Sequence, residues 1–215
     1  MARALIPITI IAALVATGAV AVLMHFRPAP PSALTTDPGM DVLSVPEFQL
    51  TNQDGETVTR NDLIGQLTIV DFFFSNCPFI CPPMSRNMKR AQDALSGTGV
   101  RFLSISVDPE HDTPERLAEY ARELGADTAR WTFASGERAE VTRILTEGLL
   151  LAAPTENPNQ PIRLGDGSEM SNILHPSHFI FIGPDAKIIS LTNGLDQSQV
   201  DLLVLRARAA WDELN

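Results

Sequence analysis

The feature of the sequence that most constrains the fold is a strand-like run followed at once by both cysteines of the chain. Residues 67–74, LTIVDFFF, are rich in β-branched and aromatic side chains, which is typical of a strand buried on both faces of a parallel or mixed sheet. Cys77 and Cys81 follow, and the 215 residues contain no other cysteine. The prolines at 82–83 suit the first turn of a helix, which we expect to end near Leu95. The sequence therefore predicts a buried strand, a cysteine loop and a helix in direct succession.

The rest of the pattern supplies further strands for the same sheet. An Asp-Gly turn at 54–55 lies between alternating residues and predicts a β-hairpin over 47–59. A second buried strand is expected over 99–108 and a short strand over 131–136. A further hairpin is expected around the turn GPDA at 183–186.

Helices are expected after the second and third of these strands and at the end of the chain. Asp112 and Glu115 have the spacing of a capping pattern for the first of them. Ser135 is expected to cap the next. The last helix should begin near Asp196, and its expected buried face contains Leu202, Leu203, Leu205 and Trp211.

This order of elements predicts an α/β chain with a thioredoxin-like fold over residues 45–215. In that fold a mixed central sheet is flanked by helices, here preceded by an N-terminal β-hairpin, and the cysteine loop lies at a helix N-terminus. Residues 152–172 interrupt the rhythm with three prolines and two glycines. We expect them to form a long loop without regular structure, and such loops are often functional.

The beginning of the chain has a different composition. Residues 4–24 contain no charged side chain, and a helix of that length spans about 31 Å, near the thickness of a bilayer core. We therefore expect residues 1–27 to be one transmembrane helix that anchors the chain, with the remainder on one side of the membrane. A cleaved signal peptide is the alternative, because Ala-Val-Ala at 19–21 fits a cleavage site. Residues 28–44, rich in proline, serine and threonine, are expected to be a flexible tether.

The charge balance limits the kinds of partner. The chain has 16 basic and 26 acidic residues and a formal net charge of −10. Binding to nucleic acid needs a basic face that neutralises phosphates. We therefore expect no nucleic acid partner.

The spacing of the cysteines favours a soft metal ion. Cysteines at positions i and i+4 project to the same side of a helix or turn, so their sulfurs can face one atom. Soft sulfur ligands suit Cu(I) or Zn(II). A structural zinc site needs four ligands, whereas one imidazole would complete a three-coordinate Cu(I) site. The chain offers four imidazoles, of which the first ends the expected anchor: His25, His111, His175 and His178.

Three motifs in order resemble the Sco/SenC family of membrane-anchored copper proteins, which are linked to the assembly of cytochrome c oxidase. The first is C-P-x-x-C-P after a phenylalanine-rich strand, here at 77–82. The second is S-x-D-P-x-x-D-T-P, here SVDPEHDTP at 106–114. The third is a histidine eight residues before a GPDG-like turn, and His175 stands eight residues before Gly183. The turn here ends in Ala186 instead of the usual glycine.

The resemblance implies that Cys77, Cys81 and His175 bind one copper ion, as Cu(I), with a Cu(II) state left open. Asp108 is a candidate for a residue that supports the ligands without binding copper, or for a residue that switches the state of the site. His178 is a second imidazole near the site, and it either faces the core, supports the ligands or is itself a fourth ligand. The implied partner is cytochrome c oxidase subunit II, whose dinuclear copper centre would receive the ion, or a related copper acceptor. The implied location is the inner (cytoplasmic) membrane, with the C-terminal domain in the periplasm or another extracytoplasmic space.

Other functions remain open from the residues alone. A thiol–disulfide oxidoreductase could use both cysteines to keep those of the oxidase centre reduced, although its usual spacing is C-x-x-C. Whether the chain is an enzyme is therefore open, and a metallochaperone is the favoured interpretation. A peroxiredoxin is disfavoured, because Val70 and Phe74 stand where that family has its proline and threonine. A purely structural disulfide would leave His175 unexplained.

Overall fold

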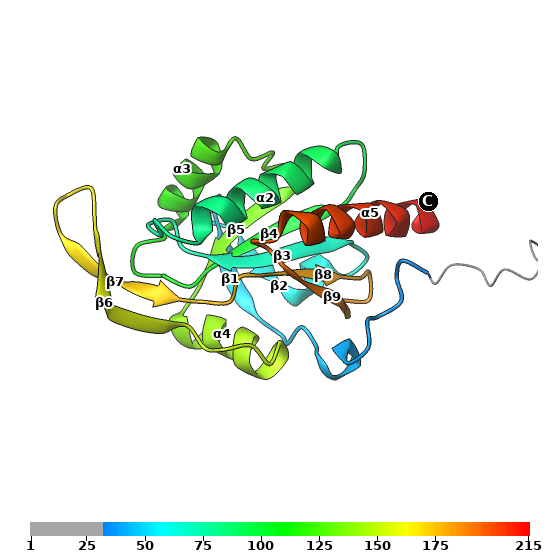
Figure 1. Cartoon of the computed structure of the whole chain (residues 1–215), viewed down its shortest axis with the longest axis horizontal. Coiled ribbons are helices and arrows are strands. Elements are labelled where there is room, and N and C mark those ends of the chain that lie inside the picture. The colour runs from blue at the N-terminus through cyan, green and yellow to red at the C-terminus, as the bar shows by residue number, and fades with distance from the viewer. Residues whose placement is uncertain (1–31) are drawn as a thin grey trace, which may run out of the picture. The chain divides into compact units, whose positions relative to one another are not determined.

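The computed structural model describes residues 32–215, and its centre is a seven-stranded sheet (Figure 1). Its strands are β1 (Gln49–Asn52), β2 (Thr57–Thr59), β3 (Thr68–Phe73), β4 (Arg101–Ser106), β5 (Trp131–Ser135), β8 (His178–Ile182) and β9 (Ile188–Asn193). They lie in the order β2-β1-β5-β4-β3-β8-β9. β3, β4 and β5 are parallel, and the other neighbouring pairs are antiparallel. The predicted mixed sheet with an N-terminal hairpin is therefore confirmed.

Helices cover both faces of this sheet. The described helices are α2 (Cys81–Ala94), α3 (Pro114–Leu124), α4 (Arg138–Arg143) and α5 (Gln197–Leu214), with short turns η1 (Met40–Val42), η2 (Arg60–Leu63) and η3 (Ile144–Gly148). Figure 1 shows α2, α3 and α5 on one side of the sheet and α4 on the other. The cysteine loop joins the end of β3 to the start of α2, as predicted.

The central strand β3 places one carboxylate on the same face as the cysteine helix. All six residues of β3 are buried, as predicted for the run before the cysteines. Val70 and Phe72 line the face covered by η3. Phe73 stacks on Tyr120 of α3, with ring centroids 5.1 Å apart. Side chains alternate between the two faces of a strand. Asp71 therefore shares a face with Phe73, and Val70 and Phe72 lie on the opposite face.

The structure differs from the prediction over residues 152–172. β6 (Thr155–Arg163) and β7 (Glu169–Leu174) form a separate antiparallel ribbon that projects from the sheet (Figure 1). The ribbon turns at Gly167, whose φ of 87° favours glycine. Its register shifts between Asn157 and Pro161, and such a bulge tolerates prolines, which donate no ladder hydrogen bond. The prediction of a loop without regular structure is therefore wrong.

The described part of the tether predicted over 28–44 is packed against the domain. Over residues 32–44, the Arg206 guanidinium of α5 donates to the Ala33 carbonyl at 3.0 Å and pairs with Asp37 at 2.7 Å. The N–H of Asp37 also donates to a carbonyl of β9 at 2.9 Å. The prediction of a flexible tether is wrong for this segment, because α5 and β9 supply partners for it.

The transmembrane anchor predicted over residues 1–27 lies outside the described residues. The alternative cleavage site at 19–21 lies there too. Within residues 32–215, no helix is long and apolar enough to cross a membrane. The anchor therefore stays a prediction.

Two predicted helix caps are wrong. The cap of α3 is Thr113, whose hydroxyl accepts from the N–H of Arg116, and not Asp112. Asp112 instead bonds to the loop before the cysteines, as described below. Ser135 ends β5, and the N-cap position of α4 falls two residues later at Glu137.

The last helix, α5, buries a different stripe from the one predicted. Leu203 is buried and Trp211 packs partly against the core, whereas Leu202 and Leu205 are 66% and 65% exposed. The buried positions recur every three or four residues, as one face of a helix requires, and include two alanines: Val200, Leu203, Ala207 and Ala210. Leu202 and Leu205 lie off this stripe.

Candidate metal centre

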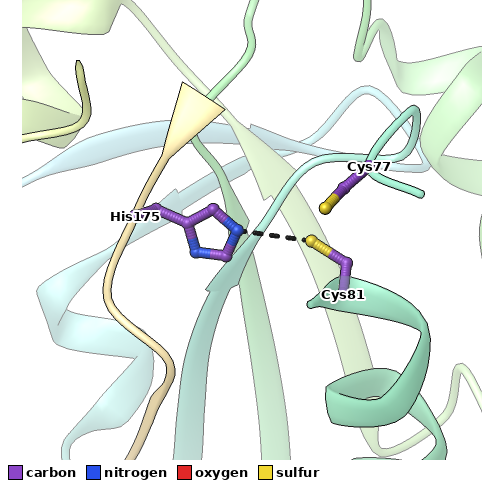
Figure 2. Close-up of side chains that lie close together, drawn as sticks. All are labelled: Cys77, Cys81 and His175. Atoms are coloured by element: carbon purple, nitrogen blue, oxygen red, sulfur yellow. Dashed lines mark hydrogen bonds between the residues drawn. The ribbon is translucent and has the colours of Figure 1, made fainter. Parts of the chain in front are cut away.

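Three side chains that are far apart in the sequence meet at the N-terminus of α2. Cys77 lies in the loop after β3, Cys81 begins α2, and His175 follows β7. One ligand atom from each lies within 4.8 Å of the other two, and Cys81 Sγ is 3.3 Å from His175 Nε2 (Figure 2). Residues 32–215 contain no other such group of histidine, cysteine and acidic side chains. The structure therefore brings together the three predicted ligands.

The imidazole of His175 is oriented for binding through Nε2. Its Nδ1 lies 3.1 Å from the carbonyl oxygen of Pro176. A carbonyl only accepts hydrogen bonds, so Nδ1 carries the proton and Nε2 presents its lone pair toward the sulfurs. The ring also packs edge-on against Phe74, with centroids 5.9 Å apart. In metal-binding histidines, a hydrogen bond from the ring nitrogen that does not bind the metal fixes the orientation of the ring.

The two thiols share one proton unequally. The pKa of Cys77 is lowered to about 4, chiefly because the Cys81 thiol donates a hydrogen bond to its sulfur, with help from His175 and from the N–H groups of Cys81 and Phe79. Burial raises the pKa of Cys81, and the neighbouring Cys77 raises it further. A metal ion that binds both sulfurs must therefore displace the proton held at Cys81.

A buried carboxylate holds the loop that leads to Cys77. Asp112 is 1% exposed, and it accepts hydrogen bonds from the N–H of Ser75 at 3.1 Å and from the Ser106 hydroxyl. The Arg116 guanidinium donates to the Ser75 hydroxyl at 3.1 Å. Asp112 was expected to cap a helix because of its spacing to Glu115. Its place in the motif SVDPEHDTP was the sequence feature that indicated another role.

The two other candidate residues lie outside the three-ligand group. Asp108 is buried and bonds to the His111 ring, with Nδ1 to Oδ2 at 2.8 Å. His178 begins β8, and its Nδ1 is buried without a hydrogen-bond partner. Supporting roles for Asp108 and His178 beside the ligands therefore stay predictions. The Asp108–His111 pair was not expected from the sequence.

A second buried carboxylate, Asp71 of β3, lies within electrostatic range of the centre. The Ser104 hydroxyl donates to Asp71 Oδ1 at 2.5 Å and accepts from the Trp131 indole N–H at 2.9 Å. Burial raises the pKa of Asp71 to about 6, and the Ser104 hydrogen bond is the largest influence in the opposite direction. Its negative charge also raises the pKa of Cys81. A lone acid in an otherwise apolar strand was visible in the sequence, but we assigned it no role.

We expect Asp71→Asn to stabilise the fold at pH 7 but not at pH 4. The folded-state pKa lies above the ordinary value of 3.8, so the free energy of unfolding falls as the pH rises from about 4 to about 6. Asparagine does not ionise, and the variant should gain about 3 kcal/mol at most, less the weakened Ser104 bond. Urea unfolding at the two pH values measures this.

The control for that prediction is Asp212→Asn, which changes an exposed carboxylate of α5. It should leave stability nearly unchanged at both pH values. An equal effect of Asp71→Asn on stability at pH 4 and pH 7 would contradict a pKa of Asp71 that is raised by folding.

The fold and the site together define a class of protein: a domain with a thioredoxin-like arrangement whose C-x-x-x-C loop and distant histidine form a centre for a soft metal ion. The SCO1/SenC family model matches residues 37–207. The SCO1 protein homolog of Bacillus subtilis (strain 168) is 31% identical over 169 residues, which cover 77% of this chain and 82% of that protein. The chain therefore belongs to the SCO1/SenC family, as the resemblance implied.

Solved structures agree with this assignment. BsSco, described as a member of the Sco family of cytochrome c oxidase assembly proteins with a disulfide switch, has a TM-score of 0.67 and 30% identity, over 82% of this chain and 97% of that one. Copper-bound ScoI of Arabidopsis thaliana has a TM-score of 0.62 at 24% identity, over 76% and 97% of the two chains, and supports the fold. The predicted fold is thus confirmed. The chain spans 45% of the length of mitochondrial relatives that it also matches.

Proposed function

We propose that this chain binds one Cu(I) ion through Cys77, Cys81 and His175 and delivers it to the dinuclear copper centre of cytochrome c oxidase subunit II. The main observation in favour is the convergence of two sulfurs and one imidazole nitrogen within 4.8 Å. Two soft sulfurs and a nitrogen suit Cu(I), and the group lacks the fourth ligand of a structural zinc site. The copper in a related structure and the oxidase assembly role of BsSco support the same proposal.

The residues of the centre account for loading and release of the ion. Cys77 offers a thiolate near neutral pH, and Cys81 gives up its proton when the ion binds. His175 donates through Nε2 and is held by the Pro176 carbonyl. Release then requires ligands of the acceptor to replace these three in turn. Because the cargo leaves the protein, the function is that of a metallochaperone.

A second function, thiol–disulfide reduction, is favoured by the unequal thiols. The Cys77 thiolate would attack a disulfide of the acceptor and form a mixed disulfide while one acceptor thiolate leaves. Cys81 would then lose its proton, attack Cys77, and release the second acceptor thiol, so that the acceptor gains two electrons and the chain forms a Cys77–Cys81 disulfide. That disulfide would remove both sulfur ligands.

The two functions are separated by mixing the copper-loaded chain with the apo copper domain of subunit II. We expect copper to move to the acceptor, followed by its absorption spectrum, without net thiol oxidation. His175→Ala is the matched variant, because it should impair copper transfer while retaining thiol exchange. Thiol exchange without copper transfer in the unchanged protein would contradict the chaperone and favour the reductase.

We also propose that residues 1–27 anchor the chain in the inner membrane, with the domain from residue 45 on the periplasmic side. The uncharged stretch at 4–24 supports this. Extraction of membranes with alkaline carbonate should leave the chain in the pellet. Protease added outside spheroplasts should degrade the domain, and protection of the domain would contradict the orientation.

A further inference from the structure

A tight turn directly after β3 contacts all three residues of the metal centre. The N–H of Cys77 donates to the Phe74 carbonyl oxygen at 3.2 Å, which closes a turn over residues 74–77. Cys77 is itself one of the three candidate ligands. The N–H of Phe74 donates to the Cys81 sulfur, and the Phe74 ring packs edge-on against His175, with centroids 5.9 Å apart. A displacement of this turn would therefore disturb the arrangement of all three ligands.

A buried carboxylate from another segment holds this turn at Ser75, the residue after Phe74. Asp112 lies between β4 and α3 and is 1% exposed. Its Oδ1 and Oδ2 lie 3.3 and 3.1 Å from the Ser75 backbone nitrogen, whose N–H they accept. Asp112 Oδ2 also accepts from the hydroxyl of Ser106, the last residue of β4. The carboxylate therefore ties the turn to the central sheet.

The start of α3 holds the same residue by a second contact. The Arg116 guanidinium donates through Nε to the Ser75 hydroxyl at 3.1 Å. Arg116 also pairs with Glu119 and Glu123, and its side chain is 27% exposed. A hydrogen bond is electrostatically stronger in buried surroundings than where water competes for its partners. We therefore regard the carboxylate of Asp112 as the stronger of the two restraints on the turn.

We propose that Asp112 is a positioning residue for copper binding, which holds the turn at 74–77 so that two sulfurs and one imidazole nitrogen are placed in advance for one Cu(I) ion. This inference rests on the proposed function, because it takes the three candidate ligands as those that bind the ion. Asp112 lies outside the three-ligand group and acts through the turn. Ligands that are ordered before the ion arrives lose less entropy when it binds, which raises the affinity. Without the carboxylate, the Ser75 N–H loses its partner and the turn gains conformational freedom.

The test is competition for Cu(I) between a chelator and the reduced full chain, made with the unchanged protein and with two variants of Asp112. We expect Asp112→Ala to lower the Cu(I) affinity about tenfold, at the smaller end of the range for residues that support metal ligands. Asp112→Asn should lower it about threefold, because the amide oxygen can still accept from the Ser75 N–H, whereas the second carboxylate oxygen is lost. Partial recovery of affinity by asparagine is the result expected of a hydrogen-bond acceptor.

Two controls separate the contact at the turn from other effects. Ser75→Ala removes the hydroxyl that Arg116 contacts but keeps the N–H that Asp112 accepts, so the Cu(I) affinity should stay within about twofold of the unchanged value. Val141→Ala removes two buried methyl groups from α4, on the other side of the sheet (Figure 1). It should lower the stability of the metal-free domain without changing the Cu(I) affinity. Urea unfolding of each metal-free variant measures that stability.

Three results would contradict the positioning role while leaving the proposed function intact. The first is a folded Asp112→Ala variant that binds Cu(I) as tightly as the unchanged protein. The second is a Ser75→Ala variant that loses as much affinity as Asp112→Ala, because the hydroxyl contact would then hold the turn. The third is an equal loss of affinity in Val141→Ala, which would assign the effect to overall stability.

Two further results complete the test. If Asp112→Ala does not fold, Asp112→Asn decides alone, and a Cu(I) affinity equal to that of the unchanged protein contradicts the positioning role. If the unchanged protein itself fails to compete with the chelator for Cu(I), the proposed function fails and this inference with it.

Discussion

Replacing Cys81 by serine is expected to abolish tight Cu(I) binding. The Cys81 sulfur lies 3.3 Å from His175 Nε2 and shares a proton with Cys77, so it is central to the ligand group. A serine hydroxyl is a harder ligand and stays protonated near neutral pH. Loss of a residue that hydrogen-bonds to a metal ligand lowers the metal affinity about 10- to 100-fold. Loss of the ligand itself should therefore lower the Cu(I) affinity more than about a hundredfold. Cys77→Ser should behave in the same way.

Competition with a Cu(I) chelator under reducing conditions measures these affinities. Circular dichroism and thermal unfolding of the metal-free variants show whether each still folds, which separates a lost ligand from a lost domain. A folded Cys81→Ser variant that keeps the affinity of the unchanged protein would contradict binding through both sulfurs.

Replacing His175 by alanine is expected to lower the Cu(I) affinity more than about a hundredfold. The effect should be smaller than that of the cysteine variants, because two thiolates remain to hold the ion. His175 provides the nitrogen of the centre, and its ring is fixed by the Pro176 carbonyl and by Phe74. The same chelator competition, made over a range of pH, measures the loss.

The matched control for this variant is His178→Ala, which removes an imidazole three residues away. His178 lies outside the three-ligand group, so its removal should leave copper affinity and stoichiometry unchanged. An equal loss in both variants would make His178 a ligand. Unchanged affinity and stoichiometry in His175→Ala would instead contradict the three-ligand centre.

The part of the fold around the cysteines was predictable because its determinants are local. The run at 67–74 is apolar over the length of a strand, and the prolines at 82–83 suit only the first turn of a helix. The structure accordingly places β3 and α2 on either side of the cysteine loop. Local patterns of this kind need no knowledge of the rest of the chain.

The third ligand was not predictable from local pattern. His175 lies 94 residues from Cys81, and nothing in its own neighbourhood distinguishes it from His178. The resemblance to the Sco/SenC motifs provided the distinction. The contacts of Asp71 and Asp112 were missed for a related reason, because their partners belong to other strands and loops.

The segments predicted wrongly are those stabilised by distant partners or by unusual geometry. Residues 32–44 have the composition of a linker, yet Arg206 of α5 holds them in place. The prolines of residues 152–172 disfavour a regular strand, yet a bulge accommodates them in the β6–β7 ribbon. In α5 the prediction favoured large leucines, whereas the buried stripe includes the small Ala207 and Ala210.

The most direct test of the central claim is X-ray absorption spectroscopy of the reduced full chain loaded with one equivalent of Cu(I). The account predicts two sulfur ligands and one nitrogen ligand for each copper, with the nitrogen contribution lost in His175→Ala and kept in His178→Ala. Two results would contradict a Cys77–Cys81–His175 centre. One is copper bound by three or more sulfurs, and the other is copper bound by no sulfur.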